Sequence, residues 1–302
     1  MLDLRRLQVL IELDGHGSFS AAAEALHLTQ SAVSQHVAAL EREVGLPVVE
    51  RSTRPIGLTE AGHALVKHAR AVLARLDDAE QELAQIAGRW RGRLRFGSFP
   101  SALTTFVPTA VTRFKERQPE VTLTVIDDHL QRLLPRLKNG ELDVALIYDH
   151  DALTHKPDDD LDRVHLLDDP FHAVLPAEHK LARNRRAIKL EQLAGETWVG
   201  GAPTSSWFQI VRNSCHQAGF EPTVAFTTDD YLAVQAFAAA GAGVSVIPGL
   251  AVHHPLPGVQ IRTLASPPVR QISLARRAHG FRSPASVTMV DALKTAAAQQ
   301  PG

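Results

Sequence analysis

One stretch decides the fold of the N-terminal part: Ser18-Phe19-Ser20-Ala21-Ala22-Ala23-Glu24-Ala25-Leu26-His27-Leu28-Thr29-Gln30-Ser31-Ala32-Val33-Ser34-Gln35-His36-Val37. It contains two short helical segments joined by residues 27–29, which are too few for anything except a tight turn. The small side chains of residues 21–23 allow the two helices to cross closely. This pattern is typical of a helix-turn-helix, which places its second helix in the major groove of DNA.

The predicted second helix has one apolar face and one polar face. The hydroxyl of Thr29 can cap it by accepting from a backbone N–H one turn later. Val33, Val37, Leu40 and Val44 follow at spacings of four, three and four and form a buried stripe. The opposite face carries uncharged hydrogen-bonding side chains, which suit base edges. We predict DNA contacts from Ser20, Thr29, Gln30, Ser31, Ser34, Gln35 and His36. The alternative is an amphipathic surface helix whose polar face meets only water.

Two further segments complete a predicted winged helix-turn-helix domain over residues 1–59. An apolar helix near the N-terminus could close a three-helix core; its apolar residues are Leu4, Leu7, Leu10, Ile11 and Leu13. Residues 46–59 form a hairpin punctuated by proline and glycine, with Arg51 and Arg54 near its tip. We predict that this hairpin is the wing and that both arginines contact phosphate or the minor groove. The alternative is a solvated loop with ordinary surface arginines.

Residues 60–89 are predicted to form a long linker helix capped by Thr59. Its apolar residues alternate spacings of four and three, which is the pattern of a coiled-coil seam. They are Leu65, Ala69, Val72, Leu76, Ala79, Leu83 and Ile86. We assign dimerisation to Leu65, Val72, Leu76 and Leu83. The alternative is a long helix packed on its own chain.

Strands alternate with helices from residue 94 onward, which favours parallel-type α/β sheets. The predicted strands include residues 94–99, 121–127, 143–149, 171–176, 223–228, 244–248 and 271–278. Two such α/β lobes would form residues 90–302. We expect lobe I to comprise about residues 94–163 and 269–302, and lobe II about residues 164–268.

Ligands of open α/β sheets bind beyond the carboxyl ends of strands. The residues at these predicted positions form our candidate effector site: Ser98, Pro100, Ser101, Ala102, Asp128, Tyr148, Ala202, Thr204 and Ser205. Free backbone N–H groups near Ser101 would suit an anion, whereas Asp127 and Asp128 would repel one. Because of this acidic pair, the possible effectors include an amino acid, an amine or a sugar. For each residue taken alone, the alternative is ordinary turn chemistry.

Residues 1–63 resemble the DNA-binding domain of LysR-type transcriptional regulators. The matching residues are Ser18-Phe19-Ser20, Ala22-Ala23, Leu26, Thr29 to Ser34, Leu40-Glu41, Gly45, Glu50-Arg51, Arg54, Leu58-Thr59 and Ala61-Gly62. Val48-Val49 departs from the family's usual Leu-Phe. The resemblance implies a C-terminal two-lobed domain similar to periplasmic solute-binding proteins. It also implies a dimer or tetramer that binds an interrupted dyad in double-stranded DNA, a small-molecule effector, and RNA polymerase as a further partner.

The charge of the chain and its lack of catalytic motifs limit the possible functions. Residues 1–60 carry five basic and eight acidic side chains, and the whole chain has a formal net charge of −1, so DNA binding must depend on local placement of charge. Catalytic residues, metal ligands and cofactors are not expected, and an enzyme with a DNA-binding extension is the weakest alternative. The second alternative is a constitutive repressor or architectural protein whose cleft is empty or binds a protein. The single Cys215 cannot form an intramolecular disulfide. No apolar run reaches membrane-spanning length, and we expect a cytoplasmic protein.

Overall fold

The computed structural model describes residues 2–52, 55–87, 92–153, 159–183 and 186–300. The chain divides into two compact units. The first contains residues 1–90 with residues 138–141, and the second contains residues 91–137 and 142–302. None of the helices in the described ranges combines the length and the hydropathy that crossing a bilayer requires.

The first unit begins with three helices: α1 (Leu4–His16), α2 (Phe19–Ala25) and α3 (Gln30–Val44). Each begins at a side-chain cap, because Asp3, Ser18 and Thr29 all accept a hydrogen bond from a backbone N–H of the first turn. His27 has a φ of 54° in the turn between α2 and α3. The predicted stripe is confirmed: Val33, Val37 and Leu40 are fully buried, and Val44 packs partly buried on the same core. Of the five apolar residues named from the sequence of α1, Leu7, Leu10 and Leu13 are buried, and Val9 is buried beside them.

The predicted hairpin is present as the antiparallel strands β1 (Val49–Glu50) and β2 (Gly57–Leu58). Val48 and Val49, which depart from the usual family residues, are buried beneath it. The linker helix α4 (Glu60–Ile86) follows, and Thr59 caps it by accepting from the backbone N–H of Gly62. A Cβ on Gly62 would lie 2.1 Å from the carbonyl oxygen of Val48, so this glycine lets α4 begin directly against the hairpin.

The predicted seam of α4 divides into a buried and an exposed part. Ala69 is buried and Leu65 is half-buried near the N-terminus of the helix. Farther along the helix Val72, Leu76 and Leu83 are exposed by 46%, 43% and 66%, and the terminal Ile86 by 76%. Large apolar side chains rarely line one face of a helix in this way unless another surface covers them.

The second unit is built on a seven-stranded sheet with the strand order β10-β6-β11-β5-β3-β4, in which β9 also pairs with β6. Strands β3 and β4 are parallel, as are β3 and β5, whereas β11 is antiparallel to both β5 and β6. The sheet is therefore mixed, and the expectation of parallel-type sheets holds only for β3, β4 and β5 and for the separate pair β7 and β8. The strand bounds are β3 Arg93–Ser98, β4 Thr122–Asp127, β5 Val144–Asp149, β6 Leu161–Pro176, β7 Thr197–Gly200, β8 Thr223–Thr227, β9 Ser245–Pro248, β10 Val259–Thr263 and β11 Val269–Arg277.

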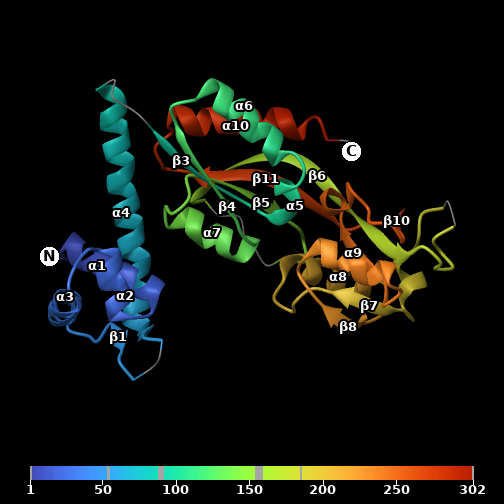
Figure 1. Ribbon diagram of the computed structural model, residues 1–302, viewed down its shortest axis with the longest axis horizontal. Helices are drawn as coiled ribbons and strands as arrows, with labels where there is room; N and C mark the ends of the chain where they lie inside the picture. Colours follow the sequence, from blue (N-terminus) through green and yellow to red (C-terminus); the bar gives the residue numbers. More distant parts are fainter. Residues whose placement is uncertain (1, 53–54, 88–91, 154–158, 184–185, 301–302) are drawn as a thin grey trace. The chain divides into compact units, whose positions relative to one another are not determined.

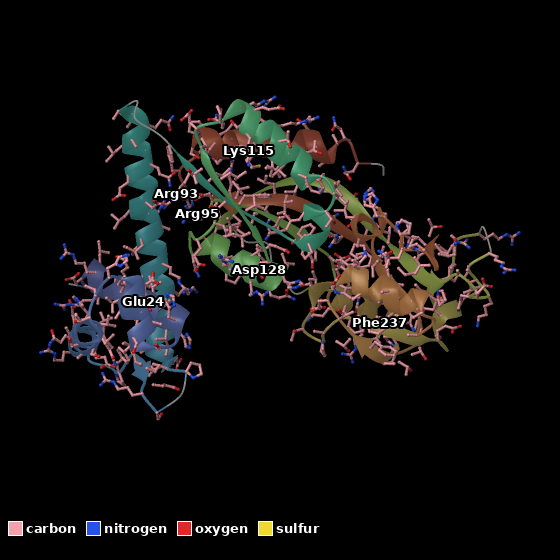
Figure 2. All side chains as sticks on the ribbon, viewed as in Figure 1. Glu24, Arg93, Arg95, Lys115, Asp128 and Phe237 are labelled. Carbon is pink, nitrogen blue, oxygen red and sulfur yellow. The ribbon has the colours of Figure 1, made fainter. Side chains whose placement is uncertain are left out.

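Six α-helices and two short 3-10 helices are described in this unit. They are α5 Pro100–Leu103, α6 Val107–Arg117, α7 Leu130–Lys138, α8 Ser206–Gln217, α9 Tyr231–Ala239, α10 Pro284–Ala297, η1 Leu190–Leu193 and η2 Gly249–Val252. Helices α6 and α10 lie side by side on one face of the sheet, and α7 lies on the other (Figure 1). Phe226 of β8 stacks on Phe237 of α9, with 4.8 Å between the ring centroids; Phe237 is labelled in Figure 2.

Two segments were not predicted correctly. β6 begins at Leu161, ten residues before the predicted strand, and β10 was missed. β6 pairs with β11 up to Pro170 and with β9 and β10 from Phe171 onward. The lobe boundary at residues 163 and 164 stays a prediction, and the pairing favours a boundary near residue 170. As predicted, the C-terminal segment returns to the first part of the sheet, because β11 pairs with β5.

Candidate nucleic-acid interface and effector site

The polar face of α3 has the arrangement that a recognition helix needs. Ser20, Thr29, Gln30, Ser31, Ser34 and Gln35 are all exposed, and His36 is half-buried. Two hydrogen bonds order the N-terminal end of this surface: Ser20 Oγ lies 3.4 Å from Gln30 Oε1, and the hydroxyls of Thr29 and Ser31 lie 3.0 Å apart. Ser34 and Gln35 lie one turn farther along and are exposed to solvent, so their donors and acceptors can face a base edge.

The wing arginine that the structure describes is held by a carboxylate. Arg51 Nη2 lies 3.0 Å from Glu41 Oε2, and the other oxygen of Glu41 accepts from the backbone N–H of Val48. Arg51 remains 62% exposed, so a phosphate can still reach its guanidinium, but Glu41 already compensates part of the positive charge. Arg54 lies outside the described residues. Arg6 is similarly paired with Glu43 at 3.1 Å, so acidic side chains of this unit offset part of its positive charge.

The residues predicted to bind an effector lie at the carboxyl ends of β3, β4, β5 and β7, but they are not equally accessible. Ser98, Ser101, Ala102, Asp128, Tyr148 and Ser205 are buried, Pro100 and Ala202 are half-buried, and Thr204 is exposed. A hydrogen bond joins the two halves of the set, because Gln131 Nε2 of α7 donates to the carbonyl oxygen of Thr204 at 2.6 Å. The backbone carbonyl of Ser101 is also occupied, since the hydroxyl of Thr105 donates to it at 2.8 Å.

A buried arginine that the sequence did not reveal lies at the centre of this site. The side chain of Arg270, on β11, is 1% exposed. Its Nη2 donates to Ser101 Oγ at 2.6 Å, and its Nε donates to Asp169 Oδ2 at 2.7 Å. Its guanidinium carbon lies 4.8 Å from the ring centroid of Phe99 and 4.9 Å from that of Tyr148, within cation–π range. Its partner Asp169 lies in β6 and is 2% exposed, although the adjacent carboxylates Asp168 and Asp169 look in the sequence like part of a solvated loop.

Buried charge explains the ionisation of the groups around Arg270. Burial disfavours the charged guanidinium, but Asp169, Tyr231 and Tyr148 around it, together with its hydrogen bond to Asp169, outweigh burial and raise the pKa of Arg270 above its usual range. Burial likewise raises the pKa of the Tyr148 phenol, which is hydrogen-bonded with Ser206 and Arg270. Tyr148 is therefore a neutral hydrogen-bonding group that touches both the β5 side and the α8 side of the site.

The acidic pair behaves differently from the sequence-based expectation. Burial opposes the ionisation of Asp128, but hydrogen bonds from Arg132, the backbone of His129 and Arg136 outweigh it and hold the pKa below its usual range. Figure 2 shows Asp128 just past the end of β4, at the start of α7, from which both arginines come. Because Asp128 is compensated by these two arginines, it does not argue against an anionic effector. Asp127 is exposed, and partial burial of its carboxyl raises its pKa.

The α8 side of the site is ordered by another aspartate that the sequence did not single out. Asp229 Oδ1 accepts from the backbone N–H of Ala202 and from Trp207 Nε1, each at 3.2 Å. The ring of Trp207 packs edge-on against Tyr231, with 5.4 Å between centroids. Trp207, Phe208 and Phe99 are 2%, 6% and 3% exposed, so these aromatic residues form core rather than open walls.

Two family models together match almost the whole chain. Residues 4–63 match the bacterial regulatory helix-turn-helix protein, lysR family, and residues 87–298 match the LysR substrate binding domain. The chain belongs to the LysR family. It is thus a DNA-binding transcriptional regulator, and its second unit is a substrate-binding domain that takes a small-molecule effector. The resemblance found in the sequence is confirmed.

Similar proteins support this assignment. The chain is 30% identical over 250 residues to the Hca operon transcriptional activator HcaR of Escherichia coli K12, which covers 82% of each protein. It is 34% identical over 247 residues to a probable hydrogen peroxide-inducible genes activator of Mycobacterium avium, covering 82% of this chain and 78% of that protein. Both are named as activators, in keeping with a family of transcriptional regulators.

Solved structures show that the whole architecture is shared. A full-length OxyR variant from Pseudomonas aeruginosa superimposes with a TM-score of 0.74 and 27% identity, over 97% of this chain and 95% of that one. Full-length CbnR complexed with its target DNA gives a TM-score of 0.65 and 22% identity, over 98% and 100% of the two chains, and shows the fold alone. The predicted arrangement of a helix-turn-helix unit before an α/β effector domain is therefore confirmed.

The only cysteine of the chain does not have the environment of a reactive thiol. Cys215 is fully buried on α8, and burial raises its pKa to about 12. A thiol with so high a pKa is almost entirely protonated near neutral pH and is a poor nucleophile.

Proposed function

We propose that the exposed polar residues at the N-terminal end of α3 read base edges in each half of an interrupted dyad. The observation that carries the proposal is the division of α3 into a fully buried apolar stripe and an exposed face of uncharged donors and acceptors. Gln35 can pair bidentately with adenine, and Ser34 can pair with any base. Arg51 and Arg54 are proposed to contact the backbone and fix the register. Because the target is DNA, we place the regulator's action in the cytoplasm.

Two subunits are proposed to pair through the exposed seam of α4. Leu65, Val72, Leu76 and Leu83 would then be covered by the same residues of a second α4, as in a two-stranded coiled coil. Such pairing sets the spacing of the two recognition helices, and a dimer of dimers would extend contact to a second region of the operator. RNA polymerase is the proposed downstream partner.

The effector is proposed to bind at the carboxyl ends of β3, β4, β5 and β7, where Ser101, Tyr148 and Thr204 gather. It acts by favouring one relative position of the two halves of the effector domain. Such coupling requires tighter binding to one state, typically by about 1–3 kcal/mol.

The base-reading assignment is tested with Ser34→Ala and Gln35→Ala. Each variant should lose roughly 1–3 kcal/mol of discrimination at the base pair it reads, measured by competition between the operator and single-base variants of it. Lys67→Ala, an exposed change on α4, is the control. Unaltered discrimination in both α3 variants would refute the assignment.

The alternative of a constitutive regulator is favoured by one observation: Ser101, Asp128 and Tyr148 are all hydrogen-bonded within the chain itself. A screen of small organic acids, amines and sugars by thermal shift separates the two cases. An effector-responsive domain shows a shift that depends on ligand concentration and is lost in Ser101→Trp, whereas a constitutive regulator shows none.

A further inference from the structure

The ion pair between Asp169 and Arg270 lies where β6 changes partners. The two residues face one another in the register of β6 and β11. The next residue pair of this ladder, Pro170 and Val269, is its last, and Phe171 already pairs with Pro248 of β9. The side chains of Asp169 and Arg270 are 3% and 1% exposed. The pair is therefore buried at the junction between the two parts of the sheet.

The hydrogen bonds of this pair reach two different segments of the chain, α5 and η2. On one side, Arg270 Nη2 donates to Ser101 Oγ of α5. On the other, Asp169 Oδ1 accepts from the backbone N–H of Leu250, in η2, at 3.0 Å. Since Asp169 Oδ2 also accepts from Arg270, a continuous hydrogen-bonded chain runs from Ser101 through both charges to Leu250.

This chain can transmit a local change because none of its members is free to turn away. The guanidinium is a planar group with donors in fixed directions, and it packs against the rings of both Phe99 and Tyr148. In a buried site, a charged group that loses one partner is not rehydrated, so its remaining bonds must adjust. A ligand that takes the Ser101 hydroxyl as a partner competes with Arg270 for it.

We propose that Arg270 is a positioning residue that couples Ser101, in the effector site, to the backbone at Leu250, across the junction of the sheet. The proposal rests on the proposed function, in which the effector binds beside Ser101. When a ligand hydrogen-bonds the Ser101 hydroxyl, the guanidinium of Arg270 moves and its ion pair with Asp169 changes. This weakens the hydrogen bond from the Leu250 N–H to Asp169 that fixes η2. Arg270 acts through Asp169 and needs no contact with DNA.

The test is amide hydrogen exchange at Leu250 in the full-length protein. Ser101→Ala removes the hydroxyl that Arg270 binds and should accelerate exchange at Leu250 roughly tenfold, the effect of weakening one charge-assisted hydrogen bond. Ser286→Ala is the matched control, because Ser286 is also buried but lies on α10, where its hydroxyl donates to the Ser283 carbonyl at 2.8 Å. Exchange at Leu250 should be unchanged in the control.

A direct route from α5 to η2 has to be separated from the route through Arg270, since these two segments also lie close together. Asp169→Asn keeps an oxygen that can accept from Leu250 but removes the charge that holds Arg270. In that background Ser101→Ala should produce no further acceleration at Leu250. The proposal would be overturned if Ser101→Ala accelerated exchange at Leu250 equally with and without Asp169. It would also be overturned if Ser101→Ala left this exchange unchanged, as Ser286→Ala should.

The substitution Arg270→Lys gives a second, independent measurement. Lysine keeps the charge but lacks the fork that reaches Ser101 and Asp169 together, so Leu250 should exchange faster even where the melting temperature is largely retained. Wild-type exchange at Leu250 in this variant would also overturn the proposal. The thermal-shift screen is run in parallel: absence of any ligand-dependent shift in the wild-type protein refutes the proposed effector site, whereas a ligand-dependent shift together with unaltered exchange in Ser101→Ala refutes only the coupling.

Discussion

Replacing Glu41 with glutamine should strengthen DNA binding by releasing Arg51. The Arg51–Glu41 pair is 3.0 Å long and the arginine is 62% exposed, so the pair contributes only about 0.2–1 kcal/mol. If phosphate contact requires this pair to break, its removal should raise affinity roughly 1.4- to 5-fold per subunit. The side-chain amide oxygen of glutamine can still accept from the backbone N–H of Val48, so the fold of the hairpin is retained.

The assay is titration of a non-specific duplex at several salt concentrations, followed by fluorescence anisotropy. A newly engaged phosphate makes the slope of log affinity against log salt steeper by about 0.9 for each contact. Glu43→Gln is the matched control, because it removes the same charge from α3 and releases Arg6 from Glu43 instead, while Arg6 keeps its 3.9 Å contact with Asp3. Equal gains in Glu41→Gln and Glu43→Gln would show that only net charge matters. A gain that persists in the Glu41→Gln, Arg51→Gln double variant would refute the role of Arg51.

Three further predictions concern stability and assembly. Gly62→Ala places a Cβ 2.1 Å from the Val48 carbonyl oxygen and should destabilise the first unit by about 1–3 kcal/mol in chemical denaturation, whereas Gly15→Ala, which meets nothing within 4 Å, should not. Leu83→Lys should weaken dimerisation in sedimentation experiments, and Gln85→Lys on the same helix should not; equal dimerisation of both would contradict the seam. Because the pKa of Asp128 is lowered in the folded protein, its stabilising contribution is complete above the unfolded value of about 3.9 and is lost as the pH falls through the folded pKa. Acid unfolding of Asp128→Asn should therefore depend less on pH in that range, and an unchanged acid transition would contradict it.

The parts of the structure that the sequence predicted are those governed by local chemistry. The caps at Thr29 and Thr59 and the stripe of Val33, Val37 and Leu40 follow from neighbouring residues along one helix. The alternation of strands and helices was also visible, because each element carries its own periodicity. Family resemblance added the domain order, which similarity to full-length regulators confirms.

The parts that were missed depend on residues far apart in the chain. Asp169 and Arg270 are separated by 101 positions, and each looks like an ordinary surface residue beside its neighbours. The predicted last strand began at residue 271, so Arg270 was not placed on it at all. Whether β11 would run parallel or antiparallel to β5 depends on the path of the intervening chain, which local periodicity does not report. The charge of Asp128 was misjudged for a similar reason, since its compensation by Arg132 and Arg136 requires the helix α7 to be in place.

The central claim is that α3 of each subunit reads half of an interrupted dyad. The most direct measurement is a selection of sheared genomic DNA from the source of the protein, with washes of increasing salt and sequencing of the retained fragments. The account predicts a few strongly enriched fragments that share an interrupted dyad, and loss of this enrichment in the Ser34→Ala, Gln35→Ala double variant. Retention of fragments without a shared sequence, or of the same fragments by the double variant, would contradict it.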